Sequence, residues 1–279
     1  MNKSEYEMLD ILNKLRQEHG AISVKAEFEA EGTRTDELLR LIDLARRADL
    51  KISLKIGGCE AVRDLLESQQ FGVEYIIAPM VETPYALKKF ILAKNKAYSI
   101  EQQKYTDFLI NVETITTFNN LEEIVNIAKA SDGVQGLVFG RVDFVGSMGQ
   151  SRMQVDSPDI TKYIIEAANS CKATGLDMVV GGAISSDSLI ALKEIYDVHL
   201  TRFETRKVVF DSAALNSSNI INGLKATLLF ELLWLENKRD YYHWIKHEDG
   251  KRIEMLEKRW NDLQQINRQS RRGSGAVND

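Results

Sequence analysis

Gly136-Leu-Val-Phe-Gly-Arg-Val-Asp-Phe-Val-Gly-Ser-Met-Gly149 joins an apolar strand to a glycine-flanked turn that carries a single aspartate. Earlier in the chain, Phe108-Leu-Ile-Asn-Val-Glu113 repeats this plan, because an apolar strand ends on a carboxylate and a helix start follows. The carboxyl ends of neighbouring parallel strands meet at one edge of a sheet, so we expect Glu113 and Asp143 to emerge together. Two carboxylates placed in this way suit a hard divalent cation, which takes oxygen ligands and keeps waters or substrate oxygens in its remaining positions.

Strands and helices alternate along most of the chain. Residues 4–18 carry apolar side chains at helical spacing, and Gly20 ends that helix before a β-prone run over 21–28. The alternation continues with strands at 51–56, 73–78, 108–113, 135–139, 177–181 and 197–202, and with helices at 36–48, 59–69, 84–95, 120–130, 158–174 and 186–196.

Repeated βα units with short connections require a mostly parallel sheet covered by helices. This number of units predicts an α/β protein, namely a (β/α)8 TIM barrel with additional C-terminal helices. The eighth strand is the least defined, and either Lys207-Val-Val-Phe210 or an N-terminal segment is a candidate for it.

The alternation stops near residue 212. We therefore predict a catalytic barrel with an N-terminal helix over 1–212, a C-terminal helical extension over 213–268 and a disordered tail over 269–279. The extension should contain a long helix followed by a second helix from about 248 to 267. Its apolar stripes need a partner surface, which is either the bottom of the barrel or a neighbouring subunit in a homo-oligomer.

Composition bounds the class of protein. The formal net charge of −5 and a pI near 5.6 argue against nonspecific binding of nucleic acid as the main task. The two cysteines, Cys59 and Cys171, are far apart and form no CxxC motif, which fits a reducing cytoplasm. The N-terminus lacks the pattern of a signal peptide, and no apolar run approaches the roughly 20 residues that span a bilayer. We expect a soluble cytoplasmic protein with a small-molecule substrate and no membrane partner.

Three segments together resemble successive signatures of the metal-dependent pyruvate aldolase and citrate lyase β-subunit family. They are Ala78-Pro-Met-Val-Glu-Thr83, Asn111-Val-Glu-Thr114 and the run from Gly133 to Gly149. The similarity covers roughly residues 21–206, and the third segment is its most specific part, since strand, glycine, aspartate and the following Ser-x-Gly all coincide. The resemblance implies a (β/α)8 barrel, a C-terminal helix exchanged between subunits, and a 2-oxo acid bound on Mg²⁺, Mn²⁺ or another divalent cation.

The same resemblance assigns roles to particular residues. It implies that Glu113 and Asp143 are the metal ligands, and that backbone amides of Arg141, Val142 and Asp143 hold the substrate carboxylate in the turn after Gly140. A dication bound to the keto oxygen would stabilise the enolate formed when a methyl proton is lost. Taken separately, Glu113 and Asp143 are also compatible with helix caps.

The chain departs from the family pattern at three places. Lys55 stands where the pyruvate aldolases usually have an arginine, and it is either a partner of the substrate or enolate or an ordinary lysine of the barrel rim. No histidine stands in the stretch from Glu27 to Gly32, where the family usually has one. Arg141 replaces a common proline, and we hypothesise that its side chain binds a second anionic group.

The missing histidine directs attention to the acids around the first strand. Glu27, Glu29 and Glu31 alternate along an extended chain, so they share one face. Three acids pointing into a barrel are costly unless they are paired, and the alternative is that they face solvent. We predict that Glu29 or Glu31 transfers the proton in place of the histidine.

The favoured function is thus a divalent-metal-dependent carbon–carbon lyase or aldolase that acts on a 2-oxo acid through a pyruvate-like enolate. One alternative is a citrate lyase-like enzyme that cleaves an acyl-CoA or a hydroxy-dicarboxylate, and an enzyme that uses phosphoenolpyruvate on a related barrel is another. A barrel that binds the keto acid and the metal without turnover, as a sensor or assembly subunit, is the alternative from a different class.

Overall fold

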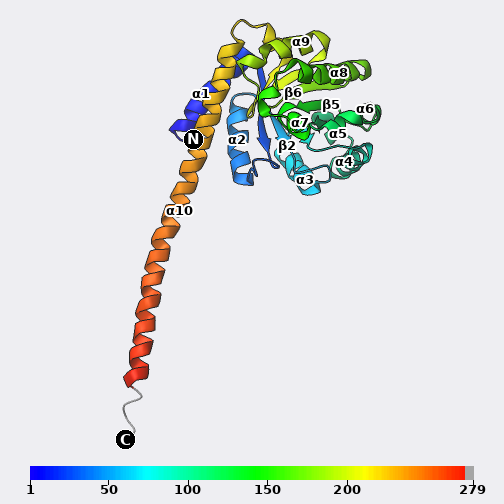
Figure 1. The fold of residues 1–279 in the computed structure, drawn as a ribbon. Coiled ribbons are helices and arrows are strands. Elements are labelled where there is room, and N and C mark those ends of the chain that lie inside the picture. The colour runs from blue at the N-terminus through cyan, green and yellow to red at the C-terminus, as the bar shows by residue number, and fades with distance from the viewer. Residues whose placement is uncertain (274–279) are drawn as a thin grey trace. The chain divides into compact units, whose positions relative to one another are not determined.

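The computed structural model describes the backbone of residues 1–273 and the side chains of residues 1–266 (Figure 1). The chain divides into two compact units after Leu232. The first unit is a closed barrel of eight strands in sequential order, with helices around its outside. The strands are β1 (Ala21–Glu27), β2 (Lys51–Lys55), β3 (Tyr75–Ala78), β4 (Asp107–Val112), β5 (Gly136–Gly140), β6 (Asp177–Gly181), β7 (Arg202–Glu204) and β8 (Val208–Asp211).

The first seven strands are parallel, and β8 runs antiparallel to both of its neighbours, β7 and β1. Only residues 205–207 connect β7 to β8, and the Thr205 N–H donates to the Val208 carbonyl oxygen across this turn at 2.9 Å. A parallel crossover needs a dozen or more residues, so such a short connection forces the strand to turn back. The segment that was one of two candidates therefore does supply the eighth strand, and with one antiparallel strand the barrel is the mostly parallel sheet that the sequence predicted.

The helices of the barrel follow the apolar periodicity and the capping residues. Thr83 and Ser157 each accept a hydrogen bond from a backbone N–H in the first turn of the helix that follows. Each of these two helices begins with a proline, whose missing N–H costs nothing there because the first N–H groups of a helix have no intrahelical partner. The helices are α1 (Lys3–His19), α2 (Thr35–Arg47), α3 (Val62–Phe71), α4 (Pro84–Ala97), α5 (Ile115–Asn119), α6 (Leu121–Ala128), α7 (Arg141–Ser147), α8 (Pro158–Thr174) and α9 (Leu189–His199).

The inside of the barrel is apolar at mid-height and charged at the mouth. Alternate side chains of the central strands form a buried cluster made of Tyr75, Ile77, Leu109, Val138 and Val179. Beyond this layer the strands end on charged residues and glycines, and active sites of such barrels lie at this carboxyl end.

The C-terminal extension is one helix, α10 (Ile220–Gly273), where two had been expected. Gly250 lies inside it without ending it, since a glycine in a helix costs only about 1 kcal/mol. Residues 220–232 belong to the barrel unit, and the side chains of Ile220, Leu224 and Phe230 are buried. The backbone of 269–273 continues the helix, and the remainder of the expected tail, 274–279, lies outside the described residues. In the part of the chain that the structure describes, no helix combines the length and apolar character needed to cross a membrane.

Candidate active site at the barrel mouth

A cavity of about 450 Å³ opens at the carboxyl ends of the parallel strands. Strands β1, β2, β4, β5, β6 and β7 each contribute side chains or backbone at their ends, and the first turns of α10 add Thr227 and Glu231. The cavity wall includes Lys55, Glu113 and Asp143. The fold thus brings residues that are distant in sequence to one concave surface, which is the usual place for a ligand site.

Glu113 follows β4 and is 1% exposed. Its Oε1 accepts a hydrogen bond from the Met80 N–H at 2.8 Å, and its Oε2 accepts one from the Asn111 amide at 2.5 Å. Glycine at position 140 makes room for this carboxylate, because a Cβ there would lie 2.8 Å from the Glu113 Cβ and 3.0 Å from Oε2. Met80 holds its N–H in place with a left-handed backbone at φ 52°, a sparsely populated conformation that is often found at functional sites.

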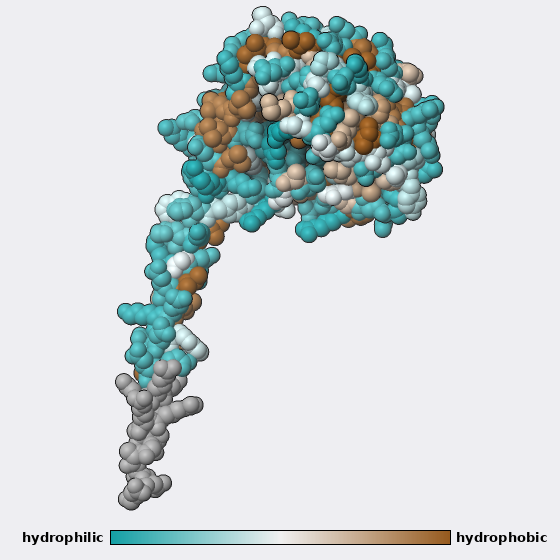
Figure 2. Space-filling view, in the orientation of Figure 1, coloured by the Kyte–Doolittle hydropathy of each residue, from teal (hydrophilic) through white to brown (hydrophobic). Residues whose placement is uncertain are grey.

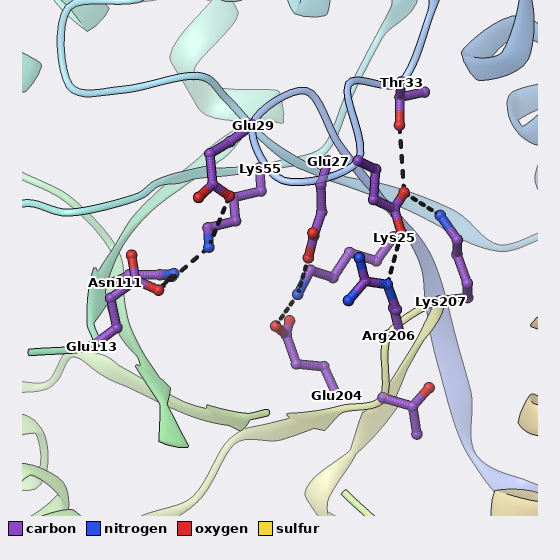
Figure 3. Close-up of polar contacts among 12 residues, drawn as sticks. Lys25, Glu27, Glu29, Thr33, Lys55, Asn111, Glu113, Glu204, Arg206 and Lys207 are labelled. Atoms are coloured by element: carbon purple, nitrogen blue, oxygen red, sulfur yellow. Dashed lines mark hydrogen bonds and ion pairs between the residues drawn. The ribbon is translucent and has the colours of Figure 1, made fainter. Parts of the chain in front are cut away.

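Lys55, the last residue of β2, lies between two carboxylates (Figure 3). Its Nζ is 3.1 Å from Glu29 Oε2 and 3.3 Å from Glu113 Oε2. Burial favours the neutral amine, but the Glu113 and Glu29 charges outweigh it, so the pKa of Lys55 is raised. Lys55 is therefore an ammonium at neutral pH.

A second buried lysine, Lys25 of β1, was not singled out from the sequence. Its Nζ lies 2.5 Å from Glu204 Oε1 and 3.1 Å from Glu27 Oε1 (Figure 3). A Cβ at position 181 would lie 2.8 Å from Glu204 Cγ, so glycine is again what leaves space for a carboxylate. Burial opposes the charge on Lys25, but both carboxylates raise its pKa above the usual range. The alternation of positions 25 and 27 on one face of β1 was the available signal.

The three acidic residues around β1 form ion pairs with different basic side chains. Glu27 pairs with Lys25, and Glu29 pairs with Lys55. Glu31 accepts hydrogen bonds from Lys207 and, at 3.1 Å, from Arg206 Nε. Because Glu29 lines the cavity and Glu31 does not, only Glu29 stays a candidate for proton transfer.

The side chain of Arg141 does not face the cavity. It is 1% exposed, and its guanidinium donates to the Gly182 carbonyl oxygen at 2.7 Å and to Asp156 Oδ1 at 2.5 Å. A further bond reaches Ser188 Oγ at 3.2 Å. Since its donors are used inside the protein, the hypothesis that this side chain binds a second anion is wrong. Arg141 instead fastens the loop after β6 to the segment before α8.

The turn after β5 leads directly into α7 (Arg141–Ser147) at the cavity wall. The first N–H groups of a helix have no intrahelical partner, and Gly140, Val142 and Asp143 line the cavity. Gly182 has φ 87°, and a Cβ there would lie 2.9 Å from the Val142 nitrogen and 3.0 Å from the Arg141 nitrogen. Glycine at position 182 therefore allows the loop after β6 to approach the start of α7 closely, where Val142 and Asp143 line the cavity and Arg141 is buried.

The donor set at the cavity wall is compatible with a hard divalent cation. Glu113 and Asp143 offer carboxylates, and Asn111 Oδ1 is a buried acceptor with no hydrogen-bond partner. Among the described side chains, no three of His, Cys, Asp or Glu cluster closely enough to hold a metal by themselves. Mg²⁺ is usually bound by one or two carboxylates and keeps its other positions for waters and substrate, so the residues fit this ion.

The lysines of the cavity do not suit a Schiff-base mechanism. Such a mechanism needs a neutral amine, and the pKa values of Lys25 and Lys55 are both raised. Burial lowers the pKa of Lys94, but its Nζ donates to the backbone carbonyls of Asp132 and Gly133, and Lys94 does not line the cavity. The lining contains Ala30 and no histidine.

Comparison with known proteins gives one match in sequence and several in fold. A family model described as HpcH/HpaI aldolase/citrate lyase matches residues 26–193. An HpcH/HpaI aldolase from Desulfitobacterium hafniense superposes with a TM-score of 0.56 at 13% identity, covering 80% of this chain and 88% of that one. A citrate synthase variant, SbnG, gives a TM-score of 0.50 at 15% identity, covering 71% and 81%. At these identities the two structures show the fold alone. No curated protein matches the sequence.

Proposed function

The chain belongs to the HpcH/HpaI aldolase/citrate lyase family, and on that premise we propose that it is a divalent-metal-dependent carbon–carbon lyase or aldolase acting on a 2-oxo acid through a pyruvate-like enolate. The family consists of lyases and aldolases, which supports a function of this type. The 2-oxo acid and the metal dependence are the steps that we add. They rest on the residues of the cavity.

One observation carries the proposal. Glu113, Asp143 and Asn111 line the same cavity at the carboxyl end of the barrel, and Asn111 Oδ1 is a buried acceptor with no hydrogen-bond partner. In our proposal these oxygens hold Mg²⁺, Mn²⁺ or another divalent cation. When bound, such an ion supplies Lewis-acid stabilisation of negative charge on the keto oxygen of the substrate.

The chain's own residues provide the rest of the chemistry. The N–H groups at the start of α7, where Val142 and Asp143 line the cavity, would bind and orient the substrate carboxylate. The Lys55 ammonium would donate to the oxygen on which charge develops. Because its pKa is raised, Lys55 keeps this charge throughout the neutral pH range.

Glu29 is the proposed proton-transfer group. Its carboxylate lies at the cavity wall, where the family usually presents a histidine, and it is held 3.1 Å from Lys55. In this role Glu29 would accept the methyl proton of the 2-oxo acid in one direction and return it in the other. Ala30, beside it in the lining, leaves space that a larger side chain would fill.

Proton NMR of pyruvate in D₂O tests the proposal. The metal-stripped protein should leave the methyl signal unchanged, and added Mg²⁺ or Mn²⁺ should cause its loss by exchange. Glu113→Gln should abolish the exchange, whereas Glu122→Gln on the exposed side of α6 should not. Exchange without metal, or full exchange in Glu113→Gln, would refute the metal assignment.

A citrate lyase-like reaction on an acyl-CoA or a hydroxy-dicarboxylate is the second candidate. The observation that favours it is the lack of any histidine in the cavity lining, where the 2-oxo acid aldolases of the family usually have one. Ion binding by calorimetry together with no pyruvate exchange would support this candidate. Ion binding with no cleavage of either substrate class would instead indicate a barrel that binds without turnover.

A further inference from the structure

Arg141 carries its charge inside the barrel unit. Hydrophilic side chains cover most of the face of this unit drawn in Figure 2, but the side chain of Arg141 is only 1% exposed. Burial lowers its pKa and the Asp156 carboxylate opposes this effect, yet a guanidinium stays protonated at any ordinary pH. A buried permanent charge is costly unless it is paired and hydrogen-bonded, so the contacts of Arg141 indicate what its side chain does.

These contacts tie the start of α7 to two other segments of the barrel. Nε and Nη2 of Arg141 donate to the Gly182 carbonyl oxygen at 3.0 and 2.7 Å, in the loop after β6. Nη2 also donates to Ser188 Oγ at 3.2 Å, just before α9. Nη1 donates to Asp156 Oδ1 at 2.5 Å, in the segment before α8. One guanidinium joins all of these groups because its donors form a rigid planar fork.

The loop after β6 has a backbone that needs such support. Gly182 has φ 87° and Ala183 has φ 54°, so two successive residues are left-handed. This conformation is uncommon for alanine, and strained conformations persist where the surrounding structure holds them. The Gly182 carbonyl, on which Nε and Nη2 of Arg141 converge, belongs to the peptide group between these two residues. Arg141 therefore holds the loop at its most strained point.

This loop and the start of α7 are adjoining parts of the cavity wall. Gly182, Ala183 and Ile184 line the cavity from the loop, and Val142 and Asp143 line it from α7. The two parts are in close contact, because a Cβ at position 182 would lie 2.9 Å from the Val142 nitrogen. A shift of the loop would therefore change the wall beside the groups to which we assign the substrate carboxylate and the metal.

We propose that Arg141 is a positioning residue, which fixes the loop from Gly182 to Ile184 against the start of α7 and so sets the affinity of the cavity for a 2-oxo acid. This inference rests on the function proposed above, and it adds a residue that touches neither the substrate nor the metal. Asp156 has the same role, since its carboxylate holds Nη1 while Nε and Nη2 hold the loop.

Arg141→Lys tests this role, because lysine keeps the charge but lacks the planar fork that bridges the loop and Asp156. The matched control is Arg202→Lys. Arg202 is also a buried arginine that pairs with an aspartate, Asp177, at 2.6 Å. It is the first residue of β7, at the end of the strand away from the mouth, and it does not line the cavity. The control therefore disturbs a similar ion pair without disturbing the cavity wall.

The rate of methyl exchange in D₂O, measured by NMR against pyruvate concentration at saturating Mg²⁺, separates KM from kcat. Arg141→Lys should raise KM on the order of tenfold, because the wall that holds the substrate is displaced. The kcat should change less, since Lys55 and Glu29 are retained. Arg202→Lys should keep the wild-type KM. An unchanged KM in Arg141→Lys, or an equal rise in Arg202→Lys, would overturn the proposal.

A double-variant cycle tests whether the ion pair carries the effect. Asp156→Asn should also raise KM, by less than Arg141→Lys, because the asparagine oxygen still accepts a hydrogen bond. The double variant should have a KM no higher than that of Arg141→Lys alone, since both changes break one set of contacts. Full additivity of the two effects would contradict the role of Asp156 and Arg141 as one unit.

Hydrogen–deuterium exchange with mass spectrometry tests the same contacts without turnover. In Arg141→Lys the backbone amides of peptides covering 181–188 and 141–147 should exchange faster than in the wild type, whereas Arg202→Lys should leave them unchanged. A wild-type chain that exchanges no pyruvate protons would count against the proposed function, and this measurement would still decide whether Arg141 holds the loop. Unchanged amide exchange in Arg141→Lys would overturn the positioning role.

Discussion

Replacing Lys25 by methionine tests the charge network of the barrel mouth. Methionine has a similar length and no charge, so the substitution removes the ammonium while filling most of its volume. Glu27 and Glu204, which are 7% and 5% exposed, then lose the cation that lies between them. A buried carboxylate without its partner retains the full cost of desolvation.

The expected loss follows from this geometry. Removing one partner of a buried ion pair costs about 3–5 kcal/mol, because the remaining charge stays buried. The barrel unit spans Met1–Leu232, and for a domain of that size each kcal/mol lowers the melting temperature by about 2–4 °C. We therefore expect the melting temperature to fall by about 6–20 °C.

The pH dependence has a defined sign. Burial acts to raise the pKa of Glu27, but Lys25, Lys55 and Arg206 outweigh it, so the pKa is lowered in the wild-type protein. This stabilisation is present above the unfolded-state pKa of about 4.3 and is lost as pH falls through the folded-state value. Lys25 is the main group that counteracts the effect of burial on Glu27, so the pKa of Glu27 rises in Lys25→Met. The carboxylate then takes up a proton more readily as pH falls, and the loss of stability caused by Lys25→Met should shrink as pH is lowered from 7 towards 5.

Urea denaturation followed by circular dichroism at pH 7 and pH 5 measures both effects. The matched control is Lys162→Met, because Lys162 pairs with Asp159 at 2.8 Å but is 75% exposed. An exposed pair is worth about 0–1 kcal/mol, and the control should be insensitive to pH between these values. A Lys25→Met variant no less stable than Lys162→Met, or one with a deficit that grows towards pH 5, would refute the reasoning.

Asp143→Ala should abolish metal-dependent activity. Because Asp143 is exposed, the unfolding free energy should change by less than about 0.5 kcal/mol. Full activity of this variant with metal would show that Asp143 is not part of the metal site. Lys55→Ala should lower kcat more than it lowers ion affinity, as measured by steady-state kinetics and calorimetry, and unchanged turnover would make Lys55 a rim residue. Gly140→Ala should lower ion affinity and destabilise the barrel by about 1–3 kcal/mol, because the new Cβ would lie 2.8 Å from the Glu113 Cβ. Gly146→Ala, with nothing within 4 Å of the new Cβ, is the control for that substitution.

Local sequence determined the architecture of the barrel to a large extent. Strand and helix periodicity, with caps such as Thr83 and Ser157, reflects interactions within a few residues and is therefore visible in the chain. The direction of β8 was equally local, because the three residues between β7 and β8 are too few for a crossover helix. The continuity of α10 could not be predicted from local sequence, since Gly250 weakens the helix without ending it.

The placement of charges depended on tertiary structure. The chain by itself identified Glu113 and Asp143 as carboxylates after neighbouring strands, and the closed barrel puts both on one cavity. It did not reveal which basic side chain pairs with each acidic residue around β1. Glu204 and Lys207 are more than 170 positions from their partners Lys25 and Glu31. Nor did it reveal that Arg141 turns inward, since its donors are satisfied by Asp156 and by the carbonyl oxygen of Gly182. Sequence pattern fixes the elements because their hydrogen bonds are short-range, whereas pairings of buried charges are settled only when distant strands close into a barrel.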